Sequence, residues 1–86
     1  MNTVNVYITP NSEKCLTCIK VDEDTASSLK NNLQDSVNGR YVINKCTSDK
    51  LIRLIDNCYF VSRIKWVFTY LSNRTNKPII LYFDIV

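Results

Sequence analysis

The sequence predicts a single small α/β domain over residues 1–86, built from a mixed four-stranded sheet and two helices. Three observations lead to this prediction. The chain has 86 residues, of which 45% are apolar, and this is enough for one hydrophobic core. Apolar residues alternate with polar ones near both ends of the chain, which is typical of strands. In two segments between them they recur every three or four residues, which is typical of helices.

The first half of the chain predicts a strand and then a helix. The strand covers residues 4–8, where every second position is apolar, and Pro10 ends it. The helix begins at Asp24 or Thr25, either of which can cap it. It ends at Asn38-Gly39, since both residues tolerate the left-handed conformation. Its apolar positions are Ala26, Leu29, Leu33 and Val37.

The second half predicts a strand, a helix and two more strands. Residues 40–45 form the first of these strands, and Thr47-Ser48-Asp49 caps a helix whose apolar positions continue to Cys58. Residues 63–71 alternate again and form the next strand. The apolar face of this strand consists of Ile64, Trp66, Phe68 and Tyr70. After a polar turn, residues 78–86 are nearly all apolar, as in a strand buried on both faces.

Residues 15–22 are compatible with two structures. As the first turns of a helix, they would place Cys15 near a helix N-terminus with Cys18 one turn later. As a strand, they would form a hairpin with the first strand, and the domain would be an α+β, β-grasp-like fold. The capping signal at Asp24-Thr25 favours the strand, but an interrupted helix fits equally well.

The motif that carries most chemical information is Cys15-x-x-Cys18. A thiolate is the nucleophile in disulfide exchange, and a nearby cation or helix N-terminus lowers the pKa of a thiol. Lys14 directly precedes Cys15, and the second thiol is close enough in the chain to resolve a mixed disulfide. Inert thiols are the alternative, with Cys46 and Cys58 packed in the core. A zinc site is disfavoured, because eleven residues separate Cys46 from Cys58 and zinc sites use two tightly spaced pairs.

The opening of the chain resembles a known family. The segment from Val6-Tyr7 through a short polar loop to Lys14-Cys15-Leu16-Thr17-Cys18 is similar to the start of small bacteriophage glutaredoxins, which have the thioredoxin fold. Beyond the N-terminal strand and the cysteine pair, only the order of the elements is similar. The family's Gly-Gly turn is absent, and Pro78 is the only candidate for its cis-proline.

The resemblance implies a thioredoxin-like fold and a thiol–disulfide oxidoreductase that reduces protein disulfides. Cys15 would be the attacking thiol and Cys18 the resolving one. No bound cofactor is implied, although glutathione or a reductase would restore the dithiol. The same resemblance implies that Tyr7, Lys14 and Pro78 surround the thiols and contact glutathione.

Other catalytic classes find little support in the sequence. The chain has no histidine and only one glycine, which excludes Ser-His and Cys-His dyads and the glycine-rich nucleotide loops. The acidic run Asp22-Glu23-Asp24 is explained by the dipole of the helix that follows it. On a strand, Arg63 and Lys65 would lie opposite the aromatic stripe of residues 64–70. That separation favours core packing and argues against stacking on nucleic acid.

Two alternatives to the redox function follow from charge and composition. Residues 40–86 carry eight basic and three acidic side chains, so this basic half or an exposed edge strand could bind a host protein. The many asparagines suggest an AT-rich genome and hence a viral or phage protein. A nucleic-acid-binding protein is the third candidate. The sequence shows no signal-peptide pattern and no apolar stretch long enough for a membrane span, so a cytoplasmic location without a membrane partner is expected.

Overall fold

Five strands and three helices make up the structure, a computed structural model that describes all 86 residues. In chain order they are β1 (Asn2–Tyr7), β2 (Thr17–Val21), α1 (Glu23–Asn32), β3 (Ser36–Val37), β4 (Arg40–Asn44), α2 (Lys45–Leu54), α3 (Cys58–Ser72) and β5 (Ile80–Ile85).

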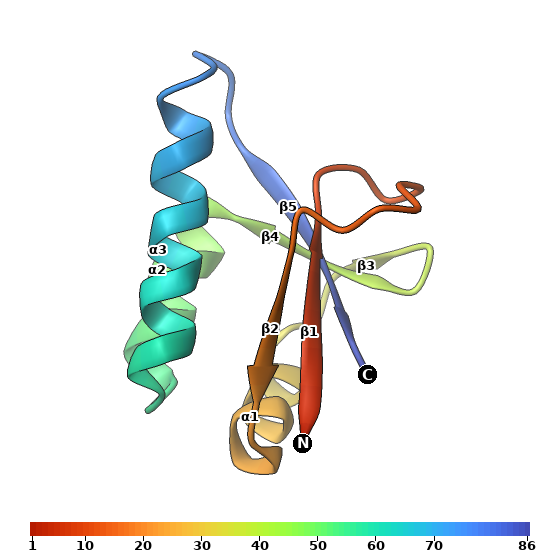
Figure 1. Cartoon of the computed structure of the whole chain (residues 1–86), viewed down its shortest axis with the longest axis vertical. Coiled ribbons are helices and arrows are strands. Elements are labelled where there is room, and N and C mark those ends of the chain that lie inside the picture. The colour runs from red at the N-terminus through yellow and green to blue at the C-terminus, as the bar shows by residue number, and fades with distance from the viewer.

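The strands form one sheet in the order β2-β1-β5-β4-β3, and every neighbouring pair is antiparallel (Figure 1). The first and last strands therefore lie side by side at the centre, while β2 and the two-residue β3 form the edges. Val6 of β1 lies opposite Thr17 on one side and Phe83 on the other. Two further backbone hydrogen bonds join Thr3 to Val86, so the two chain ends are neighbours.

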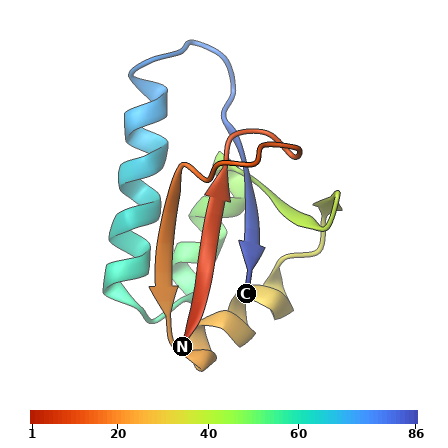
Figure 2. The ribbon, with the colours of Figure 1, turned by 45° about the vertical axis from the view of Figure 1, so that its right-hand side comes forward.

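All three helices contribute to a core on one face of the sheet, and the other face carries no helix (Figure 2). Alternate residues of the strands point into this core, among them Val4 and Val6 of β1, because side chains alternate between the faces of a strand. Phe60 of α3 meets Phe83 of β5 edge to face, with ring centroids 6.4 Å apart. The buried cluster comprises Val4, Val6, Ile19, Val21, Ala26, Leu29, Leu33, Ile43, Leu51, Ile55, Phe60, Ile64, Val67, Phe68, Leu81 and Phe83.

The predicted mixed sheet of four strands with two helices is wrong in its counts and in its pairing. The sheet has five strands, the helices are three, and no strand pair is parallel. A thioredoxin-like arrangement is not confirmed, because parallel neighbours joined through a helix are what its core requires. The strand alternative for residues 15–22 is confirmed over Thr17–Val21, which pairs with β1 in a hairpin.

The largest error concerns residues 63–71, which belong to helix α3 and not to a strand. The buried side chains of α3 recur every three or four residues, at Phe60, Ile64, Val67 and Phe68. The alternating pattern led to the wrong prediction because residues four apart, such as Ile64 and Phe68, also fit a period of two. Asn57 provides a start signal, since its side-chain oxygen accepts a hydrogen bond from the Phe60 N–H at 3.0 Å.

Asn38-Gly39 adopts the expected left-handed conformation but in a different element. The φ angles are 53° and 77°, and the two residues form the turn between β3 and β4, whose flanking residues Val37 and Arg40 pair. Two positive φ values in a two-residue loop are typical of a tight hairpin. Helix α1 therefore ends earlier than predicted, at Asn32.

The helix starts also differ from prediction by a few residues. Asp22 caps α1 and Asn44 caps α2, each accepting a hydrogen bond from a backbone N–H three residues on. The hydrogen bond from Thr25 lowers the pKa of the Asp22 carboxyl. The acidic run therefore lies at a helix start, as predicted. The second predicted helix, whose apolar positions continue to Cys58, covers parts of two helices. Helix α2 ends at Leu54, and α3 begins at Cys58.

Candidate thiol site

The two cysteines of the C-x-x-C motif lie together where the β1–β2 loop enters β2. Their Sγ atoms are 3.0 Å apart. Cys15 is in the loop, and Cys18 is the second residue of β2, opposite Asn5 of β1. Because the next residue, Ile19, is fully buried in the core, Cys18 points to the face of the sheet that has no helix.

The sulfurs meet because the chain turns just before β2 begins. In a regular strand, residues three apart point to opposite faces, so a fully extended segment would separate them. Leu16 is held by a backbone hydrogen bond from its N–H to the Val6 oxygen at 2.6 Å and packs against the core. Thr17 is held by a hydrogen bond from Arg63 of α3 to its hydroxyl at 2.8 Å. These two anchors leave the sulfurs on the same side, with Cys18 exposed and Cys15 half-buried.

The pKa of the Cys18 thiol is raised above its ordinary value. The largest cause is the hydrogen bond with Cys15, followed by desolvation and by repulsion from the charge that Cys15 can carry. Cys18 therefore retains its proton and can offer it to the sulfur of Cys15. A strand follows the pair and α1 begins only at Glu23, so neither thiol lies at a helix N-terminus. The alternative in which residues 15–22 begin a helix, with Cys15 near its N-terminus, is therefore wrong.

The three residues that the resemblance assigned to the surroundings of the thiols are not gathered there by any contact in the structure. Tyr7 is covered by the guanidinium of Arg40, which lies 3.5 Å from the ring centroid. Lys14 is exposed next to Cys15 and makes no ion pair. Pro78 is exposed in the segment before β5, with a trans peptide bond, and lines a shallow hollow with Ile8.

Cys46 and Cys58 do not pack in the core as expected. Both are exposed, near the first turns of α2 and α3 respectively. Cys46 follows the cap Asn44, the last residue of β4, by two positions, and Cys58 directly follows the cap Asn57. No group of three or more His, Cys, Asp or Glu side chains is arranged to hold a metal ion.

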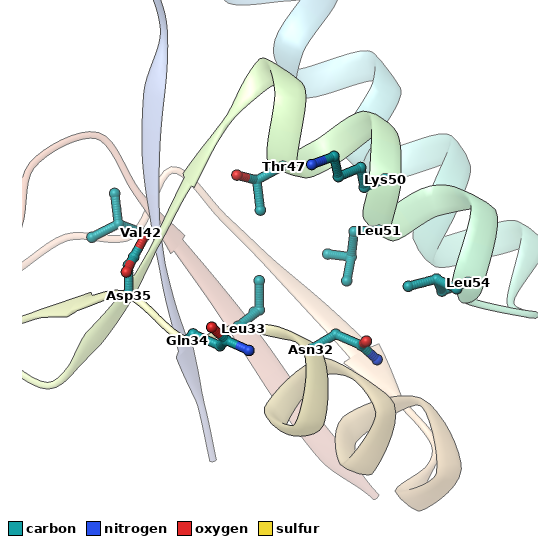
Figure 3. Close-up of a pocket in the computed structure, with 9 residues that line it drawn as sticks. All are labelled: Asn32, Leu33, Gln34, Asp35, Val42, Thr47, Lys50, Leu51 and Leu54. Atoms are coloured by element: carbon teal, nitrogen blue, oxygen red, sulfur yellow. The ribbon is translucent and has the colours of Figure 1, made fainter.

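A hollow of about 300 Å³ lies between the end of α1 and α2. Figure 3 shows Thr47, Lys50, Leu51 and Leu54 on α2, with Asn32, Leu33 and Gln34 on the α1 side. Its charged side chains are Lys50 and Asp35, and it contains no cysteine. No hydrogen bond joins the Thr47 hydroxyl to Lys50 or Asp35 in this hollow.

A group of contacting side chains on α3 and just beyond its end was missed in the sequence. Arg63, Trp66, Tyr70 and Arg74 contact one another in series along the helix. Their spacing of three or four residues is the signal that could have revealed them. It was overlooked because the segment was assigned to a strand, on which Arg63 and Trp66 would lie on opposite faces.

Comparisons with known proteins give no match to this chain, whether with protein-family models, curated proteins or solved structures. Among the three helices, none combines the length and the apolar character that crossing a membrane requires.

Proposed function

We propose that this protein is a small thiol–disulfide exchange protein in which Cys15 and Cys18 cycle between a dithiol and a disulfide. The observation that carries the proposal is the 3.0 Å separation of the two Sγ atoms. A disulfide bond is about 2.05 Å long, so closure needs an approach of roughly 1 Å. Because Cys15 belongs to the loop, that movement does not require β2 to leave the sheet.

The proposed reaction transfers two electrons from the dithiol to a protein disulfide. The Cys15 thiolate attacks one sulfur of the substrate, the substrate S–S bond breaks, and the leaving sulfur takes a proton from solvent. Cys18 then loses its proton and attacks the Cys15 sulfur. This step releases the second substrate thiol and forms the Cys15–Cys18 disulfide. A low-molecular-weight thiol such as glutathione, or a dithiol reductase, supplies the two electrons that restore the dithiol.

The roles of the two thiols follow from their surroundings. Cys15 lies in the loop before β2, next to the exposed side chain of Lys14, and we assign it the attacking role. Cys18 has a raised pKa, which suits a resolving thiol that stays protonated until the mixed disulfide forms. The pair also adjoins β2, an edge strand, so an extended substrate segment can approach along an unpaired edge.

The test uses a protein in which Cys46 and Cys58 are replaced by serine, so that only the proposed pair remains. We expect equilibration with mixtures of reduced and oxidised glutathione to convert the pair into an intramolecular disulfide through a two-electron transition, measured by mass spectrometry after alkylation. The dithiol form should also reduce insulin disulfides, and either Cys15→Ser or Cys18→Ser should abolish multiple turnover.

The matched control retains Cys15 and Cys18 and replaces Cys46 alone, which should leave both readouts unchanged. A pair that stays fully reduced in oxidised glutathione, or that forms only mixed disulfides with it, would contradict the proposal. A pair that closes but reduces no protein disulfide would contradict the exchange activity.

A further inference from the structure

Four side chains form a continuous stack along α3 and the turn that follows it. The guanidinium carbon of Arg63 lies 5.1 Å from the centre of the Trp66 ring system. Trp66 stacks on Tyr70 with centroids 5.3 Å apart and an interplanar angle of 16°. Arg74 lies 5.2 Å from the Tyr70 centroid and donates a hydrogen bond to its hydroxyl at 3.0 Å. We call these four residues the α3 ladder.

The ladder is exposed although its aromatic rings are among the largest side chains of the protein. Trp66 is 51% and Tyr70 is 38% exposed, whereas Val67 and Phe68 on the neighbouring face are buried. The core therefore does not account for these two rings. Aromatic rings of this kind in contact with arginines are a recurrent feature of surfaces that bind unpaired nucleic acid bases.

The segment that carries the ladder has charges of one sign. From Asn57 to Phe83 the chain has four basic side chains and no acidic one. Asp22, Asp24 and Asp56 line a common hollow with Thr25, whose hydroxyl accepts a hydrogen bond from the N-cap Asn57. They therefore lie towards the start of α3, and the C-terminal half, with Arg74 and then Lys77, faces no carboxylate from its own segment. A polyanion is the partner that this charge distribution fits.

We propose that the α3 ladder binds single-stranded nucleic acid. A base stacks on the outer face of Tyr70, where the flat guanidinium of Arg74 now lies, and the displaced Arg74 turns to the phosphate of the same strand. Arg74 is exposed and free to make this move. Arg63 donates a hydrogen bond to the Thr17 hydroxyl and contacts the ring of Trp66. Unpaired bases are required because only they can leave the helix stack and offer a whole face to Tyr70.

Trp66 is the only tryptophan in the chain, so its fluorescence reports directly on the ladder. The experiment titrates the protein with a twelve-residue oligothymidylate at low salt. We expect quenching of Trp66 and a logarithm of affinity that falls with the logarithm of salt concentration. For about two phosphate contacts the slope is about −1.4.

Variants are compared by the anisotropy of a labelled oligothymidylate. Tyr70→Ala should weaken binding about 5- to 150-fold, the range expected for loss of one base-stacking ring, while Trp66→Phe should weaken it less. Arg74→Ala should lower the salt slope by about one phosphate equivalent. Tyr59→Ala is the matched control, because Tyr59 is 61% exposed on the same helix but belongs to no stack, and its affinity should be unchanged.

Four results would overturn the proposal, and the first three come from the titrations. They are no change in Trp66 fluorescence at any accessible concentration, equal affinity for a duplex of the same length, and equal loss of affinity in Tyr59→Ala and Tyr70→Ala. A polyglutamate peptide that competes as well as the oligonucleotide would also overturn it, because it would show an attraction to negative charge without a role for bases. Circular dichroism of each variant confirms that α3 is intact. None of these readouts measures thiol exchange, so they test the ladder whether or not the thiols exchange.

Discussion

Cys18 shows how a single side chain depends on one neighbour. Its sulfur is exposed, and yet its pKa is raised chiefly by the hydrogen bond with Cys15. Burial and charge repulsion contribute in the same direction but less. The acidity of the second thiol is therefore a property of the pair and not of the strand that carries it.

Replacing Cys15 by alanine should lower the pKa of Cys18 towards its ordinary value, because the hydrogen bond and the repulsion disappear together. A larger fraction of Cys18 is then thiolate at any pH below its original pKa. We expect Cys18 to react faster with iodoacetamide at pH 8 in this variant than in the reduced parent protein. The pH dependence of alkylation, followed by mass spectrometry, checks this. An unchanged or slower rate would show that Cys15 does not raise the pKa of Cys18.

The cysteine pair could be found from the sequence, but its geometry could not. Spacing alone left residues 15–22 as helix or strand, and both place the thiols three residues apart. The choice depends on Ile19 and Val21, which lie in the core, and on Arg63 of α3, which donates a hydrogen bond to Thr17 from 46 positions away in the chain. Such distant contacts are not visible in a local pattern.

Among the elements, α3 illustrates how two periodicities can overlap. Ile64 and Phe68 are four residues apart, so they share one face of a helix and also one face of a strand. Trp66 distinguishes the two, because a strand would place it beside them and the helix turns it to solvent, where it is 51% exposed. The asparagine before the segment and its length of 15 residues favoured the helix, but the alternating Arg63 and Lys65 hid these signals.

The two aromatic residues of this segment should therefore respond differently to truncation. Phe68→Ala removes a ring that is 2% exposed and should lower the free energy of unfolding by about 3–5 kcal/mol. Trp66→Ala removes an exposed ring and should change it by less than about 1 kcal/mol. Urea denaturation followed by circular dichroism measures both. Phe68→Leu is a milder companion should the alanine variant fail to fold. Equal losses at positions 66 and 68 would favour the strand.

At the scale of the whole molecule, the structure is a two-layer domain with one helical face and one open face. The first and last strands form its centre, so the sheet cannot be completed until the chain ends meet. The sequence predicted that the terminal segments are strands, but not that they pair with each other. Alternation shows which residues share a face of a strand, but it does not show which other strands pair with that strand.

The central position of β1 and β5 should be visible in the exchange of backbone hydrogens with solvent. Amides of Val6 and Leu81, whose side chains are fully buried, should exchange at least about tenfold more slowly than those of Ser36 and Val37, both exposed in the short edge strand β3. Nuclear magnetic resonance in deuterated solvent measures each amide. Comparable rates at the centre and the β3 edge would contradict the strand order.

The hydrogen bond from Arg63 to Thr17 has a consequence for both proposals. Thr17 lies between the two cysteines, and Arg63 is the first member of the α3 ladder. If Thr17 moves when the sulfurs form a bond, the guanidinium of Arg63 would move with it and change the contact with Trp66. Thiol–disulfide exchange and the binding of single-stranded nucleic acid would then be linked. Whatever factor oxidation imposes on the Kd for an oligonucleotide, a bound oligonucleotide must impose on the dithiol–disulfide equilibrium.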